Sequence, residues 1–158
     1  MLQRVDHARY DRQTPLDLSA FLHGALEIDG RFSLLSGLVT QEFIGTATGM
    51  WCDGTLVLDE SFSYDNGRSE QRTWRLTFAP GGTFTSTCAD VVGAGAGLAT
   101  EHGYTHTYLF RLPIGRNGLV ARIVETYEPI SKERVHHTAN LCKWGVPFGT
   151  ITMLFVRR

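Results

Sequence analysis

The sequence predicts an all-β protein, a single antiparallel barrel of about nine or ten strands with one short helix near its N-terminus. Three observations predict this fold. Turn residues punctuate the chain at short intervals from Leu26 onward, the runs between them alternate apolar and polar residues, and the intervals leave no room for crossover helices. Closing such a sheet into a barrel protects its edge strands, so we expect a barrel.

The predicted helix lies near Pro15–Gly24. Thr14 and Pro15 are typical of an N-cap and a first helical residue, and Gly24 is expected to end the helix. An apolar stripe runs along it, made by Leu18, Phe21, Leu22 and Ala25. We expect residues 1–158 to form one barrel domain, with 1–25 as an arm and the short helix.

The strands are expected between five turns, at 52–54, 65–67, 79–82, 115–118 and 128–130. They include TLVLDESFSY, QRTWRLTFA, TFTSTCADVV, LVARIVETYE and TITMLFVRR. The run GAGAG (93–97) resembles a phosphate loop, but neither GK[ST] nor a helix start follows it. We therefore expect these glycines to mark a bend or a close approach of backbones.

Composition and charge exclude several function classes. The net charge is -1 with acids and bases interspersed, so no nucleic-acid partner is expected. No apolar run is long enough to span a bilayer, and the first residues lack the apolar segment of a signal peptide. Three scattered cysteines without CxxC spacing indicate reduced thiols in a cytoplasmic protein. The sequence allows a homodimer.

Alternation along the hairpin 55–79 indicates which side chains point inward. Even-numbered residues carry the apolar side chains in both strands, and Asp65-Asn66-Gly67 suits a three-residue loop. This register places Glu60 opposite Arg72 and Leu58 opposite Trp74, all on the inner face, together with Tyr64. A carboxylate is thus expected beside a guanidinium inside the barrel.

The stretch EHGYTHTYLFRLP (101–113) places imidazoles and phenols on one face of a strand. Its even-numbered residues should face inward, because they carry nearly all the bulk. The inward residues of this face are His102, Tyr104, His106 and Tyr108. The same sorting of the runs 119–127 and 133–141 places Glu125, Tyr127 and His137 inside and His136 outside.

Two groups of motifs carry a family resemblance. LDESFSYDNGRSEQRTWRLTF (58–78) and ADVVGAGAG (89–97) form one group, and YLFRLP (108–113) and KWGVPFGTITMLFVRR (143–158) form the other. Together they resemble a bacterial family, domain of unknown function 3833, whose members are often described as lipoproteins. The resemblance covers roughly residue 43 to the C-terminus and implies a lipocalin-like barrel without an established activity.

The chain departs from that family in two places. It lacks the lipoprotein signal, which favours a soluble relative. ETYEP (125–129) stands where the family tends to have an Asp-Asp-Trp-Met-like run. Because of this second difference, no ligand is carried over from the family.

A metal site is not the favoured interpretation of the inner face. His102 and His106 lie four strand residues apart, about 13 Å, which is too far for one ion with imidazole nitrogens about 2 Å away. A site from His106, His137 and Glu60 on different strands is the remaining alternative. We expect no metal and no cofactor, since nucleotide fingerprints are also missing.

The polar groups of the interior have structural and functional interpretations. Glu60 and Arg72 form a structural ion pair, or Arg72 holds an anionic group of a ligand while Glu60 orients it or acts as acid or base. Glu125 either returns to solvent through a bulge or has its pKa raised by an apolar wall, which suits acid/base catalysis. His106 is either a hydrogen-bonded core histidine or the base itself.

The number of these groups favours a ligand cavity over a plain core. We predict that the protein binds a small, partly hydrophobic, aromatic or carbonyl-bearing molecule and acts on it as a cofactor-independent isomerase, cyclase or lyase. The alternative is a non-catalytic lipocalin-like carrier. The candidate catalytic residues are His106, Glu125, Glu60 and Arg72. The candidate ligand-binding residues are Tyr64, Trp74, His102, Tyr104, Tyr108, Tyr127 and His137.

Overall fold

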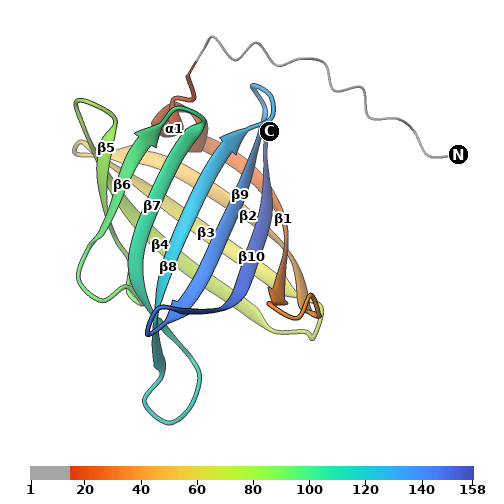
Figure 1. The fold of residues 1–158 in the computed structure, drawn as a ribbon. Coiled ribbons are helices and arrows are strands. Elements are labelled where there is room, and N and C mark those ends of the chain that lie inside the picture. The colour runs from red at the N-terminus through yellow and green to blue at the C-terminus, as the bar shows by residue number, and fades with distance from the viewer. Residues whose placement is uncertain (1–14) are drawn as a thin grey trace, which may run out of the picture.

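Alternating apolar and polar residues run through the chain from Gly24 onward, and each alternating segment forms a strand in the computed structural model, which describes residues 15–158. The strands are β1 (Gly24–Leu34), β2 (Val39–Cys52), β3 (Thr55–Tyr64), β4 (Ser69–Ala79), β5 (Thr83–Thr87), β6 (Gly95–Thr100), β7 (Gly103–Leu112), β8 (Leu119–Pro129), β9 (Arg134–Lys143) and β10 (Val146–Arg157). Each pairs antiparallel with its neighbours in sequence, and β1 also pairs with β10, which closes the barrel (Figure 1). The predicted all-β barrel is confirmed.

The hairpin of β3 and β4 has the predicted register. Glu60 lies opposite Arg72 and Leu58 opposite Trp74. Gly67 in the connecting turn has φ of +84°, the left-handed conformation that glycine adopts without strain. One hairpin therefore brings a carboxyl, a guanidinium and an indole to the barrel wall.

The helix α1 (Leu18–Leu22) is shorter than the predicted Pro15–Gly24. Its N-cap is Asp17, whose side chain accepts a hydrogen bond from the amide of Ala20 at 3.1 Å, so the predicted start at Pro15 is wrong. The predicted N-cap Thr14 lies outside the described residues. At residue 23 the backbone is already extended, and the chain continues directly into β1.

The predicted strand TFTSTCADVV is also shorter in the structure, since β5 ends at Thr87 and a turn follows. At Gly97 of the next strand the close neighbour is a side chain and not a backbone, since a Cβ there would overlap the ring of Phe84. Within residues 15–158, no helix has the length and apolar character needed to cross a membrane.

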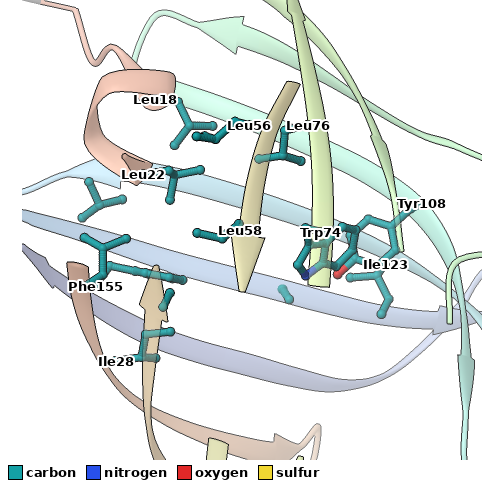
Figure 2. Packing of buried hydrophobic residues seen from close by; sticks show 14 of the residues in the cluster. Leu18, Leu22, Ile28, Leu56, Leu58, Trp74, Leu76, Tyr108, Ile123 and Phe155 are labelled. Carbon is teal, nitrogen blue, oxygen red and sulfur yellow. The ribbon is translucent and has the colours of Figure 1, made fainter. Parts of the chain in front are cut away.

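The buried core has two parts along the barrel (Figure 2). Beside α1 lies a group of aliphatic side chains, with Leu18 near Leu56 and Leu76 and with Leu22 nearby. Farther from the helix the packing becomes aromatic, where Trp74 meets Tyr108 with ring centroids 5.1 Å apart.

Candidate functional site

The barrel encloses a cavity of about 60 Å³. Apolar side chains from both parts of the core form most of its wall. The polar residues that line it are Glu60, Arg72, His106, Tyr108, Glu125, Tyr127 and His137. All of them are inward positions predicted from the alternation of side chains. They come from five strands, β3, β4, β7, β8 and β9.

The carboxylate of Glu125 is the centre of a hydrogen-bonded cluster. It lies directly opposite His106 in the ladder of β7 and β8, and His106 Nδ1 is 2.9 Å from Glu125 Oε2. His137 Nε2 is 3.3 Å from the same oxygen, and the Tyr127 hydroxyl donates to it at 3.2 Å. The Tyr108 hydroxyl donates to Oε1. A buried carboxylate with this many partners is well satisfied.

These partners decide the ionisation of Glu125. Burial acts to raise its pKa, but the positive potential of His137 and the hydrogen bonds from His106 and His137 outweigh burial and hold the pKa well below its usual value of 4.5. The predicted rise in the pKa of Glu125 is therefore wrong, because the cross-strand histidine was not anticipated as its partner. Its carboxylate is a poor general base at neutral pH.

His106 is fixed on both sides of its ring. Its Nε2 lies 2.6 Å from the hydroxyl oxygen of Ser86, and its Nδ1 faces Glu125. With Nδ1–H donating to the carboxylate, Nε2 of the neutral ring accepts the hydrogen of Ser86. Gly95 makes room for this pair, since a Cβ there would overlap the Ser86 hydroxyl and lie 2.8 Å from Nε2.

Ser86 is a site residue that the sequence reasoning missed. The hydrogen-bonded arrangement of Ser86, His106 and Glu125 resembles a nucleophilic triad. However, Ser86 is 1% exposed and is not among the residues that line the cavity. Its role in this arrangement is to hold the imidazole. The inward parity of Ser86, shared with Phe84 two residues earlier, was the available signal.

Glu60 has the opposite environment to Glu125. It is 8% exposed, and burial raises its pKa from 4.5 to about 7, although Arg72 acts to lower it. Its predicted neighbour Arg72 is confirmed by the register. Among the described residues, however, the guanidinium of Arg72 makes its ion pair with Glu70, at 3.5 Å.

Two buried nitrogen atoms at the cavity have no hydrogen-bond partner among the described residues. They are Arg72 Nε and His137 Nδ1. The guanidinium of Arg72 also lies 4.8 Å from the ring centroid of Phe110, which holds it over an aromatic face. Buried polar groups are nearly always satisfied, so these two nitrogens indicate a water or a ligand group between them and the cavity.

Three predicted site residues lie outside the cavity lining. Tyr64 donates its hydroxyl to Glu70 at 2.8 Å. Tyr104 is half-buried, and its pKa is raised by burial and then by Asp17, which places its hydroxyl near the start of α1. The prediction that His102 faces inward is wrong, because the residue lies exposed in the turn between β6 and β7.

Trp74 lines the cavity as predicted, and the edge of its indole packs on His106 with centroids 5.6 Å apart. In the part of the chain that the structure describes, no three His, Cys, Asp or Glu side chains are arranged to hold a metal ion. The alternative metal set of His106, His137 and Glu60 is therefore not assembled as ligands. A carboxylate oxygen of Glu125 instead lies between the two imidazoles.

The family whose model matches the sequence is described as "Protein of unknown function (DUF3833)", and the match covers residues 2–157. No curated protein matches the sequence. Among solved structures, the fold is similar to that of an S-type phycobiliprotein lyase from Guillardia theta, with a TM-score of 0.67, 8% identity and coverage of 93% of this chain and 94% of that one.

A second solved structure with some similarity is a redesigned β-barrel bound to DFHBI. Its TM-score is 0.42 at 14% identity, with 89% of this chain and 97% of that chain covered. At 8% identity the likeness to the lyase concerns the barrel architecture alone. Function has to be argued from the side chains of the cavity.

Proposed function

The chain belongs to the DUF3833 family, and from its interior site we propose that it binds a small, partly apolar carbonyl compound and moves a proton on it without a cofactor. The observation that carries this proposal is the contrast between two carboxyls in one cavity. The pKa of Glu60 is raised to about 7, whereas that of Glu125 is held well below its usual value. Such a contrast is typical of acid/base sites.

The proposed chemistry uses three groups of the cavity. The carbonyl oxygen of the substrate accepts a hydrogen bond from Arg72 Nε, which has no partner within residues 15–158. The Glu60 carboxylate removes a proton from the carbon beside the carbonyl, so that the C–H bond breaks and its electrons form an enolate. The positive charge of Arg72 stabilises the enolate oxygen. If the substrate carries a double bond at the β,γ position, the enolate is conjugated, and return of the proton to the γ-carbon moves the double bond and completes an isomerisation.

This assignment moves the base from His106, the first candidate from the sequence, to Glu60. Both ring nitrogens of His106 are engaged by Ser86 and Glu125, which leaves no lone pair for a substrate. Glu125 is proposed as a positioning residue, since it also orients His137 through Nε2. The unpartnered Nδ1 of His137 is then available to the ligand.

The test uses the fluorescent aromatic ketone Prodan, whose propionyl group carries exchangeable protons beside its carbonyl. We expect the protein in deuterated buffer to accelerate deuterium incorporation at the carbon beside the carbonyl. Mass spectrometry of Prodan measures this incorporation. The rate should increase as the pH rises through about 7. The E60Q variant should lose about 10²- to 10⁴-fold in rate while still binding the ketone.

A matched control is E101Q, at an exposed carboxylate in the turn before β7, which should exchange at the rate of the unchanged protein. Equal rates for E60Q and the unchanged protein would contradict the role of Glu60. Binding of Prodan without any exchange would favour the alternative, a non-catalytic carrier of a hydrophobic metabolite.

A further inference from the structure

The cavity is too small for the ligand that its lining suits. Its volume of about 60 Å³ is room for roughly two water molecules at about 30 Å³ each. Pockets for small organic ligands are usually about 300 to 1,000 Å³. Something that now fills the interior must therefore leave before an apolar carbonyl compound can enter.

The helix α1 supplies removable filling. Leu18 and Leu22 project from the same face of the helix, both are 1% exposed, and both line the cavity. Figure 2 shows α1 beside the barrel, with its leucines directed at the aliphatic part of the core. Trp74 and Tyr108 lie farther from α1 in the same view. The rings of both contact His106, with centroids 5.6 Å and 4.7 Å apart.

The attachment of α1 depends on few interactions. A helix of five residues is too short to be stable by itself, so burial of its apolar side chains holds it in place. Arg157 Nη1 donates hydrogen bonds to the carbonyl oxygens of Ala20, at 2.6 Å, and Phe21, at 3.4 Å. Gly49 of β2 lets the backbone of Leu22 approach, because a Cβ there would overlap the Leu22 carbonyl oxygen.

We propose that α1 occupies the place of the ligand's apolar body, and that the ligand is an uncharged carbonyl compound whose apolar part replaces Leu18 and Leu22. This inference rests on the proposed function for the carbonyl end of the ligand, which meets Arg72 Nε. Burial of the ligand's apolar body offsets the burial that the two leucine side chains lose. The hinge is at Gly24, which has φ of +95° and lies two residues after the end of the helix.

The ligand is uncharged because the surroundings of Arg72 already balance its charge. Glu70 lies 3.5 Å from the guanidinium, and Glu60 acts on it electrostatically. An anionic ligand would add a fourth acidic group next to Glu60, Glu70 and Glu125, which like-charge repulsion disfavours. A carbonyl oxygen satisfies the free N–H of Arg72 without this repulsion.

The test uses substitutions that weaken the attachment of α1 at residues that do not themselves line the cavity, and it measures the affinity for Prodan. Gly49→Ala forces the Leu22 carbonyl away, and Arg157→Gln removes the hydrogen bonds to Ala20 and Phe21. If the displaced state is the one that binds, each variant should bind Prodan about 5- to 10-fold more tightly than the unchanged protein, with one site per chain. Thr48→Ala and Arg122→Gln, at exposed positions, are the matched controls and should leave the affinity unchanged.

A second readout follows the helix itself. The amide of Phe21 donates to the carbonyl of Asp17 at 2.9 Å, and Prodan binding to the unchanged protein should accelerate hydrogen exchange at this amide. Retained near-ultraviolet circular dichroism in each variant excludes a loosened core as the cause of tighter binding.

Three results would overturn the proposal: equal affinity in Arg157→Gln and the unchanged protein, absence of Prodan binding in every variant, or binding that leaves the Phe21 amide protected. Stronger binding of the aromatic sulfonate ANS than of Prodan would overturn the uncharged ligand class. Where Prodan binds, the loss of deuterium exchange in E60Q tests the chemistry alone, because the Arg157→Gln affinity and the Phe21 amide report only on α1. Failure of the proposed chemistry is thereby distinguished from failure of the displacement of α1.

Discussion

Glu60 and Glu125 line the same cavity, but at neutral pH the first carboxyl is only partly ionised and the second is fully ionised. The difference follows from their partners. Glu125 accepts hydrogen bonds from two tyrosines and from His106, with His137 beside it. Glu60 is buried with Arg72 as the main group that opposes the rise in its pKa.

The first prediction concerns the pH dependence of stability through Glu60. Its folded-state pKa of about 7 lies above the value of 4.5 expected for the unfolded chain. Its contribution to the free energy of unfolding is therefore fully present below pH 4.5, decreases as the pH rises, and is lost above about 7. The loss is about 3 kcal/mol at roughly 1.4 kcal/mol per pH unit. Urea unfolding between pH 4 and 8 should show this decrease.

In E60Q the decrease should vanish, because the glutamine stays neutral in both states. E101Q, which replaces an exposed carboxyl, should retain the profile of the unchanged protein. The same pH profile in E60Q and the unchanged protein would show that Glu60 is ionised normally in the folded state.

The second prediction concerns the electrostatic link between Arg72 and Glu60. Arg72 lowers the pKa of Glu60 against the effect of burial, so R72Q should raise that pKa above 7. The pKa of Glu60 is measured from the infrared absorption of its protonated carboxyl as a function of pH, with E60Q as the reference that lacks this band. R75Q is the control, since Arg75 lies on the same strand but on the exposed outer face. An unchanged titration in R72Q would show that the two groups do not interact.

The third prediction concerns the buried carboxylate. E125Q removes the negative charge that His106 and His137 face, and it should lower the free energy of unfolding by about 3 to 5 kcal/mol at neutral pH. Because the folded-state pKa of Glu125 is depressed, the unchanged protein loses the contribution of this group as the pH falls below 4.5.

E125Q should lack this acid-side loss. The control is E128Q, an exposed position three residues along β8, which should change the stability by less than about 0.5 kcal/mol. Equal stabilities of E125Q and E128Q at neutral pH would mean that the cluster contributes nothing to folding.

The fourth prediction concerns the contact between Ser86 and His106. Gly95→Ala should cost about 1 to 3 kcal/mol, since its new Cβ overlaps the Ser86 hydroxyl. In a Ser86→Ala background that oxygen is absent, so the cost of Gly95→Ala should fall by about 1 kcal/mol. A double-mutant cycle by urea unfolding measures this coupling, with Ala96→Ser at an exposed neighbour as the control. Strictly additive effects would contradict the packing of Gly95 on Ser86.

The alternation of side chains predicted most of the interior, because a period of two leaves only two choices for each strand. It worked for Glu60 and Arg72 since the Asp65–Gly67 loop has a defined length, which sets the register as well as the face. The loop 113–118 between β7 and β8 allows several registers. The pairing of His106 with Glu125, and with it the direction of the Glu125 pKa, could therefore not be derived from the sequence.

His102 and α1 show two further limits of local patterns. The alternating pattern that includes Tyr104 also includes His102, although the strand does not extend that far. β7 begins at Gly103, and His102 lies in the turn before it. For the helix, Thr14 and Asp17 are both good N-cap residues, and their local sequence does not distinguish them. That Leu18 and Leu22 fill the interior depends on packing against strands far away in the sequence.

In the closed barrel, the polar residues of the interior come from two separate parts of the chain. Glu60, Arg72 and Trp74 all belong to the β3–β4 hairpin, whereas Ser86, His106, Glu125 and His137 come from β5, β7, β8 and β9. Substitutions within this hairpin can consequently change the carboxyl, the guanidinium and the indole of the interior together, while the histidine–carboxylate cluster on the other strands stays intact. Relatives that share this barrel can thus differ in the polar groups of their interior through changes in one short segment of the chain.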